Sequence, residues 1–390
     1  ERVMLMKDKN APSFVLHVSD FHLSESQHEL DYAYAALRKI AIELKQKEIK
    51  VDYLIHTGDV INSSDLYQKA DEISSLGAEY FREDSVGREV RHIFMAEEFE
   101  HKAADEEKAE FNSTLQRLTT ERFSAAERVI KNFISDLNIS LGNVVICSGN
   151  HDVLRFVPLK EESAKCAECG NGVHQYSYSR AEETFEPFER FLDNLEVANS
   201  RKRCVQTRSV VFCPLDNINV LLLNTNWKNP KGQKDGCYCV QCDEVKQVVD
   251  SLRDGGREDG KLNIIVAHKP IYEICETARL SYRRYIKTPF MAALHSFVGD
   301  KGIYLCGDKH TRSIVGSFFH DIPHYIGGEP LCCTNLSNIQ VEYNLLEIKQ
   351  GQVEMERKIH VKSFSTQEWA CDLRPQDATV SKLYDLCRQY

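Results

Sequence analysis

The sequence predicts a mixed α/β fold in which helices flank buried strands. Short runs of aliphatic and β-branched residues recur along the chain, and several of them end abruptly in small or polar residues. A stretch with the periodicity of an amphipathic helix separates the first two runs, as in a strand–helix–strand unit. The 390 residues exceed one average domain, but α/β folds of this size can keep one core with insertions. We therefore expect one large domain, residues 13–360, and a C-terminal extension, 361–390.

The first strand–helix–strand unit brings two acidic residues together. A strand at 13–19 leads into Asp20-Phe21-His22, and after a helix at roughly 31–50 a second strand, 51–57, ends in Gly58-Asp59. In a right-handed unit the carboxyl ends of the two parallel strands lie at one edge of the sheet. Asp20 and Asp59 should therefore be neighbours.

Residues 63–137 form a predicted helical insertion. Mixed charge runs at 97–100 and 105–108 usually face water, which favours a solvated helical excursion over a lid or a docking segment. Between Phe111 and Phe133 the apolar residues follow near-helical spacing, so this part should pack back on the sheet.

The next strand delivers a loop rich in functional groups. The apolar run 143–147 is followed by Ser148-Gly149-Asn150-His151-Asp152, which carries an amide, an imidazole and a carboxylate in sequence. Open α/β sheets place their chemistry at such carboxyl ends of strands. This loop is the strongest single indication of a functional site.

The second half of the chain supplies further strands of the same kind. The strand at 262–267 ends in His268-Lys269, and the strand at 302–306 ends in Gly307-Asp308-Lys309-His310. Two other strands precede them, at 209–212 and 218–223. The tail is predicted to be a meander with strands at 313–318, 341–348 and 353–360. A short helix near 381–387 has no assigned role.

Fourteen cysteines raise the question of disulfides or metal binding. Several lie in predicted strands and no secretory signal precedes them, which indicates a reducing, cytoplasmic setting. Two excursions, 160–175 and 228–245, carry five cysteines that could form a closed structural zinc site, namely Cys166, Cys169, Cys237, Cys239 and Cys242. The irregular second cluster and the long separation favour free thiols instead.

Composition and charge limit the partners. Hydrophobic residues make up 42% and charged residues 28%, as in ordinary soluble proteins, and no apolar run is long enough for a membrane helix. The net charge of −10 disfavours non-specific nucleic-acid binding by this chain alone, although a local cleft or a partner could reverse that. The first residue is Glu, so the chain can be a piece of a longer protein with further domains or a protein partner.

Five strand ends carry side chains that can bind metal. Each has an ordinary explanation alone, such as a turn or a satisfied histidine, but coincidence at five strand ends is improbable. Mixed imidazole and carboxylate ligands suit a pair of divalent ions. The residues are Asp20 and His22, Asp59, Asn150 with His151 and Asp152, His268, and Asp308 with His310.

The order and spread of these blocks resemble the calcineurin-like metallophosphoesterase superfamily over residues 13–348, apart from the insertions. The resemblance implies a β-sandwich flanked by helices, with a two-metal centre. It also implies the role of each residue: Asp20, His22 and His310 on one ion, Asp59 bridging, Asn150 and His268 on the other, His151 as catalytic histidine and Asp152 as the acid that orients it.

One position departs from this pattern. Asp308 stands where the family usually has a histidine. An aspartate can still bind the second ion, but it makes the ligand set more anionic and harder, which favours Mn²⁺ or Mg²⁺ over Zn²⁺, with Fe also open. Mn²⁺ is the ion we expect.

The resemblance implies a phosphoesterase that hydrolyses a phosphodiester with metal-activated hydroxide. Residues 58–63 lack the Val-Asp-Arg-Gly of protein phosphatases, and the loop ends in Asp152 where they have Glu, so the phosphodiesterase and nuclease branches are closer. The substrate classes are nucleotides, cyclic nucleotides and nucleic acids, with Lys269, Lys309 and Arg312 as candidate phosphate contacts. A phosphomonoesterase of the same fold and an inactive metal-binding or nucleotide-binding scaffold that docks partners remain alternatives.

Overall fold

The structure is a computed structural model of the 390-residue chain. It describes residues 12–63, 65–66, 69–70, 105–153, 163–165, 173–175, 181–200, 205–206, 209–226, 242–252, 261–271, 274, 289–299, 302–308, 314–319, 322–327, 338–349, 352–363 and 369–370.

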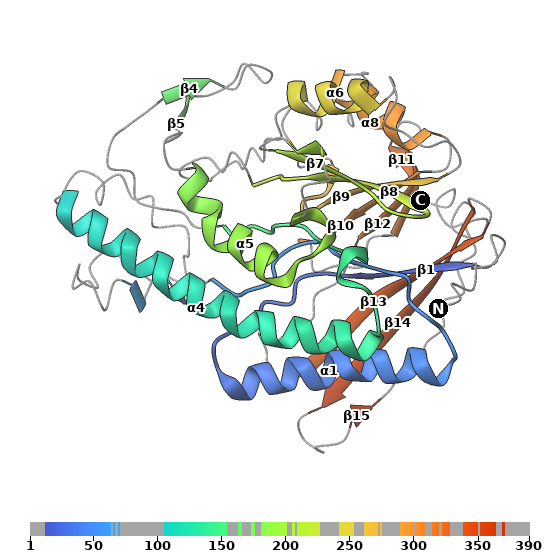
Figure 1. The fold of residues 1–390 in the computed structure, drawn as a ribbon, viewed down its shortest axis with the longest axis horizontal. Helices are drawn as coiled ribbons and strands as arrows, with labels where there is room; N and C mark the ends of the chain where they lie inside the picture. Colours follow the sequence, from blue (N-terminus) through green and yellow to red (C-terminus); the bar gives the residue numbers. More distant parts are fainter. Residues whose placement is uncertain are drawn as a thin grey trace, which may run out of the picture.

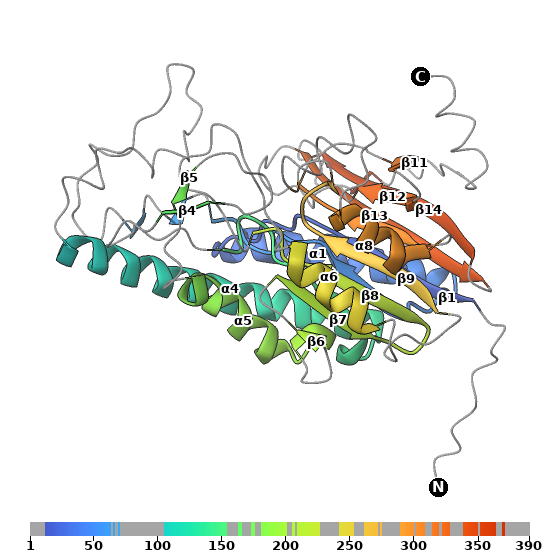
Figure 2. The same ribbon diagram turned by 90° about the horizontal axis from the view of Figure 1, so that it is seen from above.

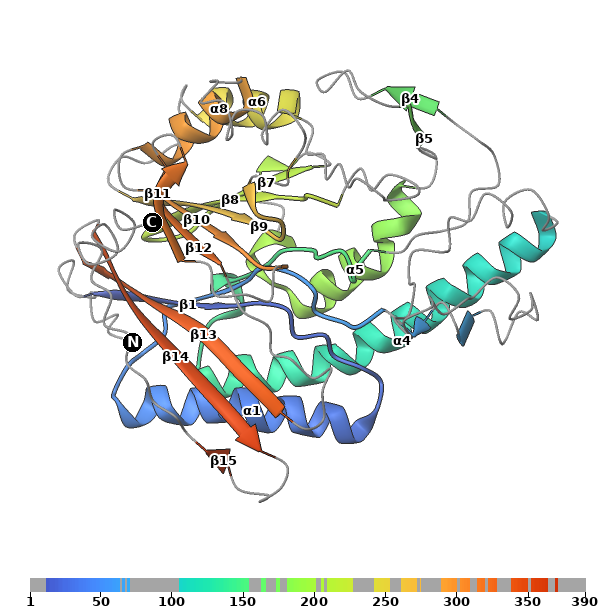
Figure 3. The same ribbon diagram turned by 180° about the vertical axis from the view of Figure 1, so that it is seen from behind.

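Two mixed sheets form the centre of the molecule. In the six-stranded sheet, of order β15-β14-β13-β1-β2-β3, the strands β1 to β3 are parallel and β13 joins β1 in antiparallel register. The long hairpin of β13 and β14 crosses the molecule beside β1 (Figure 3). The bounds are β1 Ser13–Val18, β2 Tyr53–His56, β3 Val144–Ile146, β13 Asn338–Lys349, β14 Gln352–Ser363 and β15 Trp369–Ala370.

The seven-stranded sheet has the order β11-β12-β10-β9-β8-β7-β6. Its central strands β8, β9, β10 and β12 are parallel, and antiparallel strands lie at both edges. The bounds are β6 Val205–Gln206, β7 Val210–Pro214, β8 Ile218–Leu223, β9 Leu262–Ala267, β10 Ile303–Cys306, β11 Ile314–Phe319 and β12 Ile322–Gly327. A separate small hairpin joins β4 (Ser163–Lys165) and β5 (Val173–Gln175).

Helices cover the outer faces of the two sheets. Figure 1 shows α1 and α4 on one side and α6 and α8 on the other, and Figure 2 shows that the first turns of α4 extend past the sheets. The helices are α1 Gln27–Gln46, α4 Asp105–Leu137, α5 Ala181–Leu195, α6 Cys242–Ser251 and α8 Pro289–Val298, with 3-10 turns at Leu141–Asn143 and Ala198–Ser200. Nowhere in the described part of the chain does a helix have both the length and the apolar character needed to cross a bilayer.

Alternation along the strands builds three apolar layers. On β1, Val15 packs between the sheets with residues such as Val220 and Ile264, whereas Leu16 faces α1 and α4. A third cluster joins the other face of the seven-stranded sheet to α6 and α8. The predicted fold, an α/β sandwich of two sheets flanked by helices, is confirmed.

Two local predictions need correction. The first helix begins four residues earlier than predicted, after Ser26, and ends at Gln46 because Glu48 adopts a left-handed φ of 58°. The tail is not one meander: β11 and β12 complete the seven-stranded sheet, while β13 crosses to the other sheet beside β1. The second half of the helical insertion packs on the sheet as expected, since Phe123 and Phe133 belong to the same apolar cluster as Leu16 of β1.

Candidate metal centre

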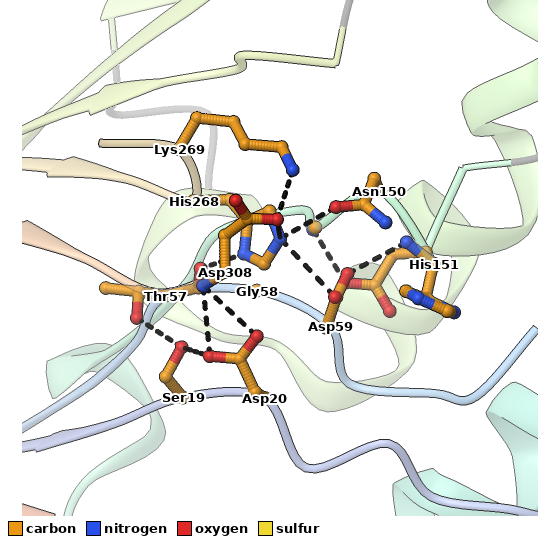
Figure 4. Close-up of polar contacts among 12 residues, drawn as sticks. Ser19, Asp20, Thr57, Gly58, Asp59, Asn150, His151, His268, Lys269 and Asp308 are labelled. Atoms are coloured by element: carbon orange, nitrogen blue, oxygen red, sulfur yellow. Dashed lines mark hydrogen bonds and ion pairs between the residues drawn. The ribbon is translucent and has the colours of Figure 1, made fainter. Parts of the chain in front are cut away.

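The predicted residues converge where strands of both sheets end. Asp20 and His22 follow β1, Asp59 follows β2, Asn150 and His151 follow β3, His268 follows β9 and Asp308 follows β10. Figure 4 shows the side chains of Asp20, Asp59, Asn150, His151, His268 and Asp308 gathered in one place. Backbone hydrogen bonds tie the segments together, from Asp20 N to Gly58 O at 2.9 Å and from Gly307 N to His268 O at 2.9 Å.

Four of the side chains stand on left-handed backbone. The φ angles are 52° at Asp20, 46° at His22, 54° at Asp59 and 73° at Asp308, and these are four of the seven non-glycine residues with positive φ in the described structure. This conformation is uncommon for non-glycine residues, although Asp and His tolerate it better than most. Such strain persists where the surrounding structure enforces it, typically at functional sites.

Two glycines allow the close approach of the loops. A Cβ on Gly149 would collide with the carboxylate of Asp59, and a Cβ on Gly307 would collide with Ser19 and the carboxylate of Asp20. The glycines that precede Asn150 and Asp308 in the sequence are therefore required by contact, not only by turn geometry.

Asp59 lies at the centre of the cluster. Its Oδ1 accepts a hydrogen bond from the backbone N–H of His151 at 2.8 Å, while its Oδ2 lies 3.4 Å from Nε2 of His268 and 3.8 Å from Nε2 of His22. Burial alone would raise the pKa of Asp59, but the surrounding histidines hold it well below its ordinary value. Asp59 therefore stays ionised inside the protein.

Two groups of potential ligands share Asp59. In one, ligand atoms of His22, Asp59 and His151 lie within 4.8 Å of one another, and in the other, those of Asp20, Asp59 and His268 do so. A carboxylate common to two such groups is the arrangement expected of a bridging ligand. The structure thus brings together the residues that the sequence placed at separate strand ends.

The orientation of His268 is set by the backbone. Its Nδ1 lies 2.9 Å from the carbonyl oxygen of Thr57, which can only accept, so Nδ1 carries a proton. Nε2 then faces the oxygens of Asn150 at 3.1 Å, Asp59 at 3.4 Å and Asp308 at 3.5 Å. Burial opposes a charge on this ring, but the carboxylates of Asp59 and Asp308 outweigh it and raise the pKa of His268 well above its ordinary value.

The carboxylate of Asp152 contacts the backbone of two segments. Its carboxylate accepts hydrogen bonds from the backbone N–H of Gly149 at 2.8 Å and of Ile61 at 3.1 Å. Nδ1 of His151 instead faces Ser63, 3.4 Å from its N–H and 3.3 Å from its hydroxyl. Ser63 is therefore one contact of the His151 ring, and Asp152 holds the backbone of the loop that carries His151.

Lys269 forms an ion pair with Asp308. The ammonium donates to Oδ1 of Asp308, and the side chains are 3% and 13% exposed. Lys269 therefore cancels the extra negative charge that Asp308 brings to the ligand set. The expectation that Asp308 makes the site more anionic needs correction for this reason.

Several predicted residues lie outside the described part of the chain. These are His310, Lys309 and Arg312 and four cysteines of the predicted zinc site, Cys166, Cys169, Cys237 and Cys239, while Cys242 is described only as the first residue of α6. Three cysteines of the described strand regions, Cys147, Cys213 and Cys306, are buried.

Sequence reasoning missed the residues that support the ligands. Ser63 and Thr57 belong to the segment around Asp59, and Ser19 precedes Asp20, but their residue types are common at strand ends. Only the spatial arrangement shows that each contacts a candidate ligand or catalytic group.

Comparison with known proteins gives little more. The sequence matches no described protein family and no curated protein. Among solved structures, one similar chain is described as a "Putative 5'-Nucleotidase from Staphylococcus aureus in complex with alpha-ketoglutarate", with a TM-score of 0.32 and 10% identity. The match covers 97% of this chain and 59% of that chain. We draw no functional conclusion from a likeness of this size.

Proposed function

We propose that the protein is a metal-dependent phosphoesterase of the calcineurin-like class that hydrolyses a phosphodiester. The observation that carries this proposal is the position of Asp59, whose carboxylate belongs to both groups of potential metal ligands. When bound, a pair of divalent cations acidifies a water molecule and stabilises charge on the phosphoryl oxygens.

The donor set fits such cations. Without metal, the raised pKa of His268 keeps a second proton on Nε2, which faces three oxygen atoms. A cation bound among these oxygen atoms would replace that proton and take Nε2 as a ligand. As the resemblance implies, one ion would be held by Asp20, His22 and Asp59, with His310 as a further ligand. This set takes Asp20 from one of the two observed groups and His22 from the other, and these two side chains lie 4.0 Å apart. The other ion would be held by Asp59, Asn150, His268 and Asp308. The mixture of oxygen and imidazole donors suits Mn²⁺.

His151 is suited to protonate the leaving oxygen. The backbone N–H of Ser63 points at Nδ1, so the neutral ring carries its proton on Nε2. The side chain is partly exposed, beside His22 with 4.8 Å between ring centres, so a substrate can reach it. Asp152 acts as a positioning residue, because its carboxylate holds the amides of Gly149 and Ile61 and thereby the loop.

The substrate class follows from charge. A chain with a net charge of −10 repels a long polyanion, which favours a nucleotide or cyclic nucleotide over nucleic acid. Lys269 is already paired with Asp308, so a phosphate could bind it only at the expense of that pair. Lys309 and Arg312 are therefore the better candidates for the contact with the substrate phosphate.

The test compares two chromogenic esters. With Mn²⁺ added, we expect hydrolysis of bis-p-nitrophenyl phosphate to exceed that of p-nitrophenyl phosphate, and Asp59→Asn to abolish both. Preference for the monoester would favour a phosphomonoesterase, and metal binding without turnover would favour a scaffold. Elemental analysis of the same sample counts the bound ions and shows whether zinc accompanies the cysteines.

A further inference from the structure

A line of buried polar side chains leads from the interior of the sandwich to Asp20. Nδ2 of Asn344 lies 3.1 Å from Nδ1 of His17, and Nε2 of His17 lies 3.1 Å from the hydroxyl of Thr57. The Thr57 hydroxyl donates to the Ser19 hydroxyl at 2.7 Å, and the Ser19 hydroxyl donates to Oδ2 of Asp20. We call these five residues the polar chain.

The polar chain is shielded from water along its length. The exposed fractions are 3% for Asn344, 0% for His17 and Thr57, 1% for Ser19 and 0% for Asp20. It crosses three adjacent strands, since His17 of β1 is paired in register with Asn344 of β13 and Thr57 directly follows β2. Buried polar groups are costly unless they are hydrogen-bonded, so each member depends on its neighbours.

The carboxylate fixes the direction of every hydrogen bond. An ionised Asp20 can only accept, so Ser19 must donate to it, and the Ser19 oxygen then accepts the proton of Thr57. Thr57 has no second proton and must accept from Nε2 of His17.

The imidazole completes this assignment. His17 is neutral with its proton on Nε2, and its bare Nδ1 accepts from the amide N–H of Asn344. All four hydrogen bonds therefore point toward Asp20. Hydrogen bonds aligned in this way polarise and strengthen one another, so the polar chain holds the group at its end firmly.

The chain also fixes the orientation of the carboxylate. Oδ2 is held by Ser19, and the backbone N–H of Asp308 lies 3.2 and 3.3 Å from the two oxygens. Oδ1 faces Nε2 of His22 at 4.0 Å, a separation that two ligands of one ion can have. Thr57 also accepts from His268 through its carbonyl, so one residue supports ligands on both sides of the cluster.

We propose that His17 is a positioning residue for metal binding, acting through Thr57 and Ser19 to hold the Asp20 carboxylate in one orientation. The inference rests on the proposed function, because it assumes that Asp20 is a metal ligand. Outer partners of metal ligands typically contribute about ten- to a hundredfold to metal affinity.

The test is a titration of the full chain with Mn²⁺ alone, in which isothermal titration calorimetry measures the affinity. His17→Leu removes the donor to Thr57 and should weaken binding about tenfold or more, and Ser19→Ala, which removes a single atom, should do the same. His17→Gln places an amide N–H near the position of Nε2 and should restore most of the affinity. Thr119→Val is the matched control, because Thr119 is fully buried in α4 and its hydroxyl has no partner among the described residues.

The outcomes separate this inference from the proposed function. If the wild-type chain binds no Mn²⁺, the proposed function fails. If the wild-type chain binds Mn²⁺ and both His17→Leu and Ser19→Ala bind it as tightly as the wild type does, the positioning role is overturned. Equal losses in His17→Leu and His17→Gln would show that packing, not the aligned donors, supports Asp20. Thermal unfolding of each variant in EDTA shows whether the fold is kept.

Discussion

Two clusters of charged side chains lie beside the segment that follows β2, and their charges balance differently. In the first, Arg122 of α4 donates to Asp65, Glu25 and the carbonyl oxygen of Asn62, and Lys69 pairs with the same two carboxylates. The Arg122 side chain is fully buried, but the two positive charges of Arg122 and Lys69 are balanced by the two carboxylates. This cluster, which we call the arginine cluster, is neutral without any added ion.

The candidate metal centre has a different balance of charges. Among these residues Asp20, Asp59 and Asp308 contribute three negative charges, while Lys269 and, because its pKa is raised, His268 contribute two positive charges, so one negative charge is left over. The remaining charge lies in a buried place where unpaired charges are costly. A structural ion cluster contains equal numbers of positive and negative side chains, whereas a cation site has an excess of negative charge that a bound cation neutralises. The difference between the two clusters favours metal binding over a purely structural role for the candidate site.

The largest effect should come from Asp59→Asn. The variant removes the carboxylate shared by both ligand groups. Loss of a residue that only supports a ligand lowers metal affinity up to about a hundredfold, so loss of this ligand should lower Mn²⁺ affinity by more than that. Hydrolysis should fall to background. At Mn²⁺ concentrations of about 100 times Kd, the metal should stabilise the wild-type fold by about 2.7 kcal/mol. Thermal unfolding with and without Mn²⁺ checks this, and an equal stabilisation of the variant would contradict the bridging role.

The next largest effect should come from His151→Ala. Loss of a general acid typically lowers kcat by about 10²–10⁴, while Mn²⁺ stoichiometry should stay unchanged. Parallel kinetics and elemental analysis check this. Equal loss of bound metal and activity would make His151 a ligand, which its place beside His22 and Asp59 would also allow. Ser63→Ala, which removes the hydroxyl beside Nδ1, should have a smaller effect in the same direction.

The arginine cluster should respond in stability alone. Asp65→Ala leaves the buried Arg122 with one strong partner fewer, but Asp65 is 40% exposed, so we expect a loss of about 1–2 kcal/mol in the free energy of unfolding. Mn²⁺ affinity should be unchanged. Lys131→Ala breaks an exposed pair with Glu127 on the same helix and, as the control, should cost less than about 0.5 kcal/mol. Urea unfolding in EDTA measures both.

The contacts of Asp65 with Arg122 and Lys69 predict that the stability of the fold depends on pH. Burial would raise the pKa of Asp65, but Arg122 and Lys69 outweigh it and hold the pKa below its ordinary value. A carboxyl with a lowered pKa stabilises the fold fully above its unfolded pKa of about 3.9, and this stabilisation is lost as the pH falls further. The difference in stability between wild type and Asp65→Ala should therefore be constant near neutral pH and shrink below about pH 4. A difference that stays constant down to pH 2 would contradict this account.

The strand ends could be predicted from the sequence because each depends on local pattern alone. An apolar run that stops at Asp20, Asp59 or His268 marks both the strand and the group at its end. The supporting contacts depend on which strands become neighbours. His17 and Asn344 lie 327 residues apart and meet only because β13 crosses to the sheet of β1. No local pattern carries that information, and for the same reason the sequence predicts a single meander in the tail.

The burial of Arg122 was hidden for a related reason. An arginine among the charged residues of a long helix is typical of a solvated face, and only the return of the segment around Asp65 encloses it. Lys269 is similar, since it lies next to His268 in sequence but its partner Asp308 comes from another strand. Charge pairing across strands is thus what the sequence interpretation lacked, and it changes the expected charge of the site.

The smallest effect should come from Lys269→Met, which keeps the length of the side chain and removes its charge. Asp308 is then freed from its ion pair, so the site gains a net negative charge and Mn²⁺ affinity should rise, by up to about tenfold or 1.4 kcal/mol. Without metal the variant should be less stable, because a buried carboxylate has lost one of its positively charged partners. Lys261→Met is the control, since its ammonium donates to the carbonyl oxygen of Leu215 away from the cluster. Weaker Mn²⁺ binding by Lys269→Met would mean that the lysine holds Asp308 in position for the ion and does not compete with it.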